Sequence, residues 1–227
     1  MSYTRTQLMA NTREMMDATN SQRWSDAFVR TALGGVGSSE WQGILAANPY
    51  FRFGQRAVTT DASGQFAYTD LNAGSGDSAQ NWNRILAITD GNTVYRQTAF
   101  MDVPLATTSN YQTSSGLLWY DAGDDVQILP VSSGLALTVT VNHTPPRIDE
   151  LSADSVTVDF PSGHESILWL EAAAYLLSKG GAENDAAQTL RAMAERERQD
   201  MYAAISRRAA RPNFLGYPDT SGDWAGF

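Results

Sequence analysis

The hydrophobic pattern of this 227-residue chain changes its period twice, and this change constrains the fold more than any single motif does. Near the amino end, the pairs Leu8/Met9 and Met15/Met16 recur at a spacing of seven residues, which places them on one helix face. From residue 50 to residue 160 the chain is rich in Thr, Val, Tyr, Gly and Asp, a composition typical of strands and turns. After residue 160 the helical spacing returns. The order of these parts predicts an α+β protein.

Two helices are expected in the amino-terminal part. The first covers residues 4–18, and the second begins after Ser25, whose hydroxyl is suited to cap it. The glycines among residues 34–37 are expected to break the second helix, because glycine destabilises helix interiors. Residues 40–47 are expected to resume it.

The middle of the chain contains several strand and hairpin signals. Asp90-Gly91 predicts a tight hairpin between residues 85–88 and 93–96. The runs 117–120 and 126–129 flank an acidic turn, and apolar residues alternate over 135–141 as in a half-buried strand.

The carboxy-terminal part begins with a helix start signal. Ser162 and Glu165 have the spacing of a capping box, in which each side chain accepts a hydrogen bond from the backbone of the other. We expect a helix that ends at Lys179-Gly180 and a second one over residues 185–208. The chain is thus divided into amino-terminal helices (1–49), a β-rich domain (50–160), carboxy-terminal helices (161–211) and a tail (212–227).

The tail is rich in aromatic residues although Pro218 and three glycines prevent it from forming a stable element. It either packs on its own domain or docks on another chain, and aromatic side chains contribute strongly to interfaces. The candidate docking residues are Phe214, Leu215, Tyr217, Trp224 and Phe227.

The excess of negative charge is confined to the middle of the chain. Residues 61–160 include twelve acidic and three basic residues, whereas the two ends together have thirteen of each, so the net charge of −9 arises in the middle. This charge argues against general nucleic-acid binding, which requires a basic surface. The middle is either a solvated acidic surface or a wall that lies near a polyanion without binding it.

Motifs for catalysis are lacking in the sequence. There is no cysteine, and His143 and His164 do not have the spacing of a zinc site. The glycines of residues 34–37 are not followed by the Lys-Ser/Thr of a phosphate-binding loop. Residues 121–125 lack the terminal glutamate of a calcium loop. We therefore expect a protein that is not an enzyme and has no cofactor or bound metal.

Two regions of the sequence carry a family resemblance. One is the run Arg23-Trp24-Ser25-Asp26-Ala27. The other runs from Val126 to Pro130 and through the strand 135–141, Pro145-Pro146, the acidic residues 149–154 and Phe160–Glu165 to the helix 167–177. In the order of these features the chain resembles the head-to-tail adaptor proteins of tailed bacteriophages, also called connector or head-completion proteins.

This resemblance implies a four-helix core, formed by the helices of the two ends, with a large inserted antiparallel β domain and an extended tail. It also implies a homo-oligomeric ring, commonly a dodecamer, in the virion neck. Such a ring binds beneath the portal protein, offers a platform to a downstream tail or neck protein, and lets genomic DNA pass through its lumen. The subunit would be made in the cytoplasm of the host and have no membrane partner.

Two other functions are compatible with the residues. Trp82, Trp119 and Tyr120 form a possible sugar-stacking platform, which would make the β domain a glycan-binding or tail-associated module. A hydrolase with paired carboxylates is the third possibility, because the many acidic residues of the middle offer chance pairs.

Overall fold

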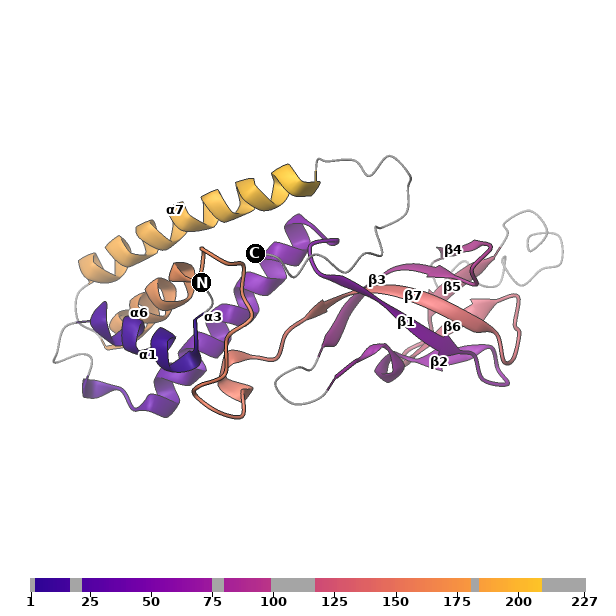
Figure 1. Ribbon diagram of the computed structural model, residues 1–227, viewed down its shortest axis with the longest axis horizontal. Helices are drawn as coiled ribbons and strands as arrows, with labels where there is room; N and C mark the ends of the chain where they lie inside the picture. Colours follow the sequence, from indigo (N-terminus) through magenta and orange to yellow (C-terminus); the bar gives the residue numbers. More distant parts are fainter. Residues whose placement is uncertain (1–2, 17–21, 75–79, 99–116, 181–183, 210–227) are drawn as a thin grey trace. The chain divides into compact units, whose positions relative to one another are not determined.

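The computed structural model describes residues 3–16, 22–74, 80–98, 117–180 and 184–209. The described residues form two compact units, shown in Figure 1. The helical unit contains those up to Phe51 and from Pro145 onward, and the β unit contains those from Arg52 to Thr144. The middle of the chain is therefore an insertion between two parts of one helical unit.

Among the described residues, the helical unit has four α-helices and a short 3₁₀ turn. Thr4 caps the first helix in a reciprocal pair with Gln7, and Ser25 accepts a hydrogen bond from the amide of Phe28 at the start of the second. The elements are α1 (Arg5–Glu14), α3 (Asp26–Ala47), η4 (Ile148–Glu150), α6 (Ser166–Gly180) and α7 (Asn184–Ala209).

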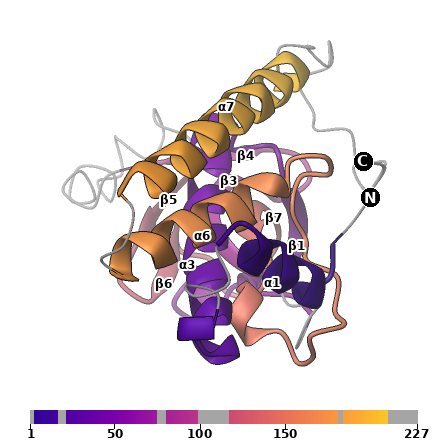
Figure 2. The same ribbon diagram turned by 90° about the vertical axis from the view of Figure 1, so that its left-hand side faces the viewer.

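Helix α6 is the centre of the helical unit. Its apolar residues occupy nearly all of its circumference, which is typical of a helix that is covered on every side. It packs against α1, α3 and α7, and the end-on view of Figure 2 shows it between α1 and α7.

Helix α3 continues through residues 34–37, so the predicted break there is wrong. A Cβ at position 34 would lie 2.0 Å from Oδ1 of Asp149, and one at position 37 would lie 2.9 Å from Cδ1 of Ile148. The two glycines therefore allow η4 to approach the helix backbone closely. The gain in packing outweighs the cost of glycine in a helix, about 1 kcal/mol per residue.

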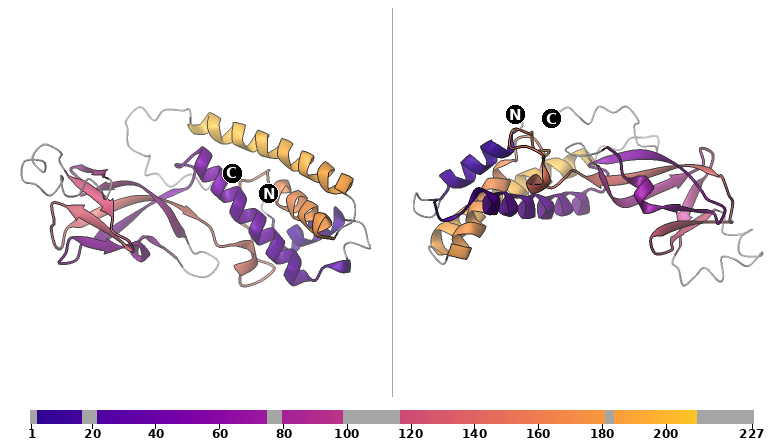
Figure 3. Two further views of the ribbon diagram at one scale, coloured as in Figure 1. Left: turned by 180° about the vertical axis from the view of Figure 1, so that it is seen from behind. Right: turned by 90° about the horizontal axis from the view of Figure 1, so that it is seen from below.

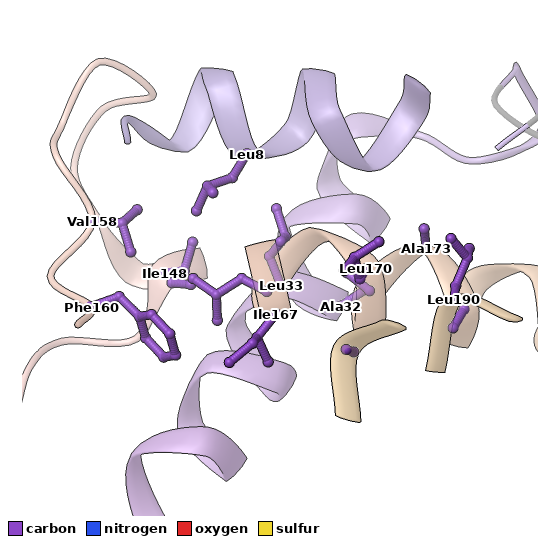
Figure 4. Close-up of a cluster of buried hydrophobic side chains, with 14 of the residues drawn as sticks. Leu8, Ala32, Leu33, Ile148, Val158, Phe160, Ile167, Leu170, Ala173 and Leu190 are labelled. Carbon is purple, nitrogen blue, oxygen red and sulfur yellow. The ribbon is translucent and has the colours of Figure 1, made fainter. Parts of the chain in front are cut away.

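The expected four-helix core is wrong as well. Residues 145–160, which their composition assigns to the β-rich part, belong to the helical unit. This mostly irregular segment supplies Ile148, Leu151, Val158 and Phe160 to the core. Figure 4 shows Ile148, Val158 and Phe160 near Leu8 and Leu33. The core is thus formed by helices packed on α6 together with a non-helical segment.

The β unit contains a seven-stranded sheet in the order β1-β7-β3-β4-β5-β6-β2. Most neighbours are antiparallel, but β4 and β5 are parallel, with Arg96 beside Leu118 and Gln97 beside Trp119. The prediction of a purely antiparallel domain is therefore wrong for this pair. Parallel neighbours need a connection of about a dozen residues or more, and the chain between β4 and β5 is long enough for it. The elements are β1 (Phe53–Thr59), β2 (Gln65–Ala67), η1 (Tyr68–Leu71), β3 (Asn81–Thr89), β4 (Val94–Gln97), β5 (Leu118–Asp121), β6 (Asp125–Leu129) and β7 (Ala136–Thr144).

The sheet curls until it is nearly closed, as the two views of Figure 3 show. Its first and last strands in the order, β1 and β2, follow each other in the chain and are joined by a turn in which Asp61 bonds to Gln65. The curled sheet encloses a second apolar core, separate from that of the helical unit. Its members include Phe66, Leu71, Ile88, Trp119, Val126, Ile128, Leu137, Val139 and Val141.

Candidate functional site

The five candidate residues of the predicted docking tail lie outside the described residues. These are Phe214, Leu215, Tyr217, Trp224 and Phe227. The capping residues lie within the described part of the chain. Ser25 precedes α3, and the Glu165 carboxylate accepts a hydrogen bond of 2.7 Å from the amide of Gly163 just before α6.

An aromatic surface lies at the start of α3. The rings of Trp24 and Phe28 are stacked, with centroids 4.8 Å apart, and the Arg23 guanidinium lies 5.5 Å from the Trp24 ring. Arg13 of α1 fixes this region by bonding to the Trp24 carbonyl and to Asp26. Phe28 is nevertheless 39% exposed. We call this the Trp24–Phe28 surface.

Other large apolar side chains of the helical unit are also exposed. Tyr175 on α6 is 41% exposed and lies 5.7 Å from the Lys179 ammonium, and Met193 on α7 is 50% exposed. Exposed Met15 and Tyr50 complete the set. The helices therefore present apolar groups that the unit itself does not cover.

Many of the acidic residues have local structural roles. Oδ1 of Asp61 accepts hydrogen bonds from the amides of Ser63 and Gln65, and Oδ1 of Asp90 accepts from those of Asn92 and Thr93. These bonds lower the pKa of Asp90. Asp154 pairs with two arginines of the helical unit. Ion pairing therefore offsets the charge of Asp154, whereas Asp61 and Asp90 keep their charge in the turns that they stabilise.

The end of the sheet where β3 begins and β7 ends carries a polar and aromatic cluster. Tyr68 on η1 and Trp82 on β3 stack nearly in parallel, with centroids 4.4 Å apart and planes inclined by 8°. The Tyr68 hydroxyl donates to Asp121, and burial together with this carboxylate raises the pKa of Tyr68. Both rings are half-buried. Trp119, in contrast, is 5% exposed and belongs to the β core, so it is not a surface platform.

Arg56 joins this cluster from β1. Its partner in the register is Val139, a core residue, so its side chain points to the inner face of the sheet. Its Nε donates to the carbonyl of Leu71 and its Nη2 to Oε1 of Gln80 (2.7 Å). Burial lowers the pKa of Arg56. The sequence interpretation missed this residue, although an arginine two positions before the inward-facing Val58 is a visible signal.

Gly54 provides room for the guanidinium of Arg56. A Cβ at position 54 would lie 3.1 Å from Nη1 of Arg56 and 3.5 Å from Cε1 of His143. His143 is the ladder partner of Trp82. Two β-bulges in β3 keep Trp82, Ile85 and Ile88 on the inner face although they are three residues apart. This arrangement brings the arginine, the histidine and the stacked rings to one end of the sheet.

Within the described ranges, no three His, Cys, Asp or Glu side chains are placed to hold a metal ion. In the same ranges, no helix has the length and apolarity required to cross a bilayer.

No protein-family model matches the chain, and no curated protein is similar to it in sequence.

Proposed function

We propose that this chain is the structural subunit of a bacteriophage neck ring. In this role it binds beneath the portal, extends the DNA channel and provides the platform for tail attachment. The observation that carries the proposal is the chain layout: both ends contribute to one helical unit, and a β unit is inserted between Phe51 and Pro145. The ordered sequence features that resemble head-to-tail adaptors lie in the helical unit and in strands β6 and β7 of the insertion.

The exposed apolar side chains of the helical unit support assembly rather than a solitary role. A monomer gains nothing from exposing Phe28, Tyr175 and Met193, whereas a subunit covers such groups at its interfaces. We assign the Trp24–Phe28 surface to a contact between ring subunits and the aromatic tail to the portal.

The test is co-assembly with the cognate portal, measured by mass photometry and electron microscopy. The wild-type chain is expected to give a portal complex carrying several copies of the 24.7 kDa subunit. Phe28→Asp is expected to reduce the number of copies bound. Gln42→Asp, which adds the same charge at another exposed position of α3, is the control and should assemble normally.

The tail is tested separately. Deletion of residues 213–227 is expected to abolish portal attachment and to leave the melting temperature of the rest unchanged. A chain that does not associate with its portal at all, although folded, would refute the proposed function.

A further inference from the structure

The β unit holds a positive charge, that of Arg56, which no carboxylate of the described residues neutralises. Every hydrogen bond of the Arg56 guanidinium goes to a neutral acceptor: the carbonyls of Gln55 and Leu71 and the amide oxygen of Gln80. No described carboxylate makes an ion pair with it. Partly buried charges are normally paired, because removing an ion from water is costly. This arginine is therefore suited to receive an anionic group from outside.

The hydrogen-bonding capacity left in the cluster is that of donors. A guanidinium has five N–H groups, and Arg56 uses three of them within the described part of the chain. Gln80 accepts from Arg56 through Oε1, and Asn72 accepts from the amide of Trp82 through Oδ1, which leaves both side-chain NH₂ groups for a ligand. Of the described carboxylates beside the stack, Asp121 accepts from the Tyr68 hydroxyl and Asp70 on η1 accepts from the amide of Ala67. The complementary ligand is therefore rich in acceptors and negatively charged.

The stacked rings define the rest of the ligand. The half-buried rings of Trp82 and Tyr68 lie face to face beside these donors, with planes inclined by 8°, so each ring covers one face of the other and leaves its outer face for an apolar contact. A binding site that combines an apolar platform with a few placed polar groups recognises a ring that is apolar on its faces and polar at its edge. A pyranose ring has this character, and its uronic acid form adds the carboxylate.

We propose that this end of the β unit binds an acidic saccharide, with the sugar carboxylate on Arg56 and the sugar ring against the Tyr68–Trp82 stack. Gln80 and Asn72 donate to ring hydroxyls. The proposal does not depend on the neck-ring function, because it concerns residues of the β unit alone.

The test is a calorimetric titration of the full chain with trigalacturonate, with galactotriose and sodium sulfate as comparison ligands. Trigalacturonate is expected to bind, and the neutral trisaccharide at least about tenfold more weakly, because it lacks the charge-assisted bonds to the guanidinium. Arg56→Gln should weaken trigalacturonate by about tenfold or more. Arg84→Gln, which removes an exposed arginine of the same unit, is the matched control and should bind like wild type.

Two further variants test the geometry while the charge of Arg56 stays in place. Gly54→Ala should weaken the binding of trigalacturonate, because the added Cβ meets Nη1 of Arg56 at 3.1 Å and displaces the guanidinium. Trp82→Leu should weaken the binding of trigalacturonate but leave the affinity for sulfate unchanged. Melting temperatures identify variants that fail to fold.

Several outcomes would overturn the proposal. These are the absence of trigalacturonate binding at millimolar concentration, unchanged binding by folded Arg56→Gln, and sulfate binding as tight as that of the saccharide. If an Asp-rich peptide binds more tightly than trigalacturonate, the ligand of this site is an acidic protein segment and the saccharide proposal is wrong.

Discussion

Nη2 of Arg198 on α7 lies 2.6 Å from Oε1 of the buried Glu40 on α3. The same guanidinium also bonds to Glu171 on α6 at 2.8 Å and to Glu195 one turn away on α7. The hydrogen bonds that Arg198 donates to Glu40 are the main reason that the pKa of Arg198 is raised, in spite of partial burial. One cation therefore joins the three longest helices of the helical unit.

Replacing Arg198 by Met should lower the free energy of unfolding by about 3 kcal/mol, because the Glu40 carboxylate is then buried without a counter-ion. Adding Glu40→Gln to this variant should recover part of the loss. Urea denaturation measures both effects. Arg191→Met, which removes an exposed arginine bonded to Ser178, is the control and should cost less than about 0.5 kcal/mol. Equal losses at positions 191 and 198 would show that the cluster contributes nothing specific.

The neighbouring glycines of α3 should respond in opposite ways to alanine. Gly35 has open space around it, so Gly35→Ala should stabilise the protein by up to about 1 kcal/mol through helix propensity. Gly34→Ala should destabilise it, because the new Cβ overlaps Asp149, whose carboxylate is held by two bonds from Arg147. Thermal unfolding of the two variants gives the comparison. Stabilisation by both would mean that η4 does not approach α3 so closely.

Asp154 makes stability depend on acid pH in a predictable direction. Its hydrogen bond from Arg5, followed by the charges of Arg5 and Arg30, lowers its pKa below the ordinary value of 3.8. A carboxylate with a lowered folded-state pKa stabilises the fold above its unfolded pKa and loses this contribution as the pH falls through the folded one.

The stability difference between wild type and Asp154→Asn should therefore be constant from neutral pH down to about pH 5 and shrink below pH 3.8. Urea midpoints at a series of pH values measure it. The control is Asp26→Asn, which removes the ion pair between Arg13 and Asp26. Because the Asp26 side chain is 66% exposed, the stability of this variant should differ little from that of wild type at any pH. A difference that grows in acid would contradict the assignment.

The two tryptophans of the β unit should differ in their effect on folding. Trp119→Ala should reduce stability by about 3–5 kcal/mol, since it empties a large volume in the β core. Trp82→Ala should cost about 1 kcal/mol, mainly the stacking with Tyr68. Denaturant unfolding followed by circular dichroism separates these cases. Any ligand test that relies on Trp119 is therefore a test of folding.

Neutralising an acidic residue tests the proposed channel wall without a folding defect only where its carboxylate makes no described hydrogen bond. Asp124 is exposed, so Asp124→Asn should leave folding intact and, in the proposed ring, slow DNA ejection. Asp61→Asn should lower stability by about 1 kcal/mol, because an amide oxygen accepts more weakly from the turn amides. Unchanged ejection with Asp124→Asn would refute a repulsive channel wall at this position.

Local signals in the sequence predicted the strands well. The hairpin at Asp90-Gly91 is confirmed by the pairing of β3 with β4, and the strands on both sides of the acidic turn are confirmed by the pairing of β5 with β6. These elements depend on turn chemistry and alternation, which neighbouring residues determine. The parallel pairing of β4 with β5 and the assignment of residues 145–160 to the helical unit depend on contacts between distant residues, and no local pattern indicates them.

The candidate site was only partly accessible from the sequence. Trp82 was a visible candidate because of its residue type, but its pairing with Tyr68 and the exclusion of Trp119 required the sheet register. In the sequence the glycines at 34 and 37 indicate a break in the second helix, because their packing partners, Asp149 and Ile148, are more than a hundred residues away. Arg56 was missed because its missing counter-ion is a property of the folded unit.

The insertion of the β unit has a consequence for gene architecture. Its first and last strands, β1 and β7, are hydrogen-bonded neighbours, and the amide of His143 bonds to the carbonyl of Arg52 where the chain enters and leaves. Adjacent strands lie about 5 Å apart, a gap that about two to four residues span. In-frame recombination could therefore delete or exchange the coding segment of the β unit. A short loop would then be enough to connect the two parts of the helical unit.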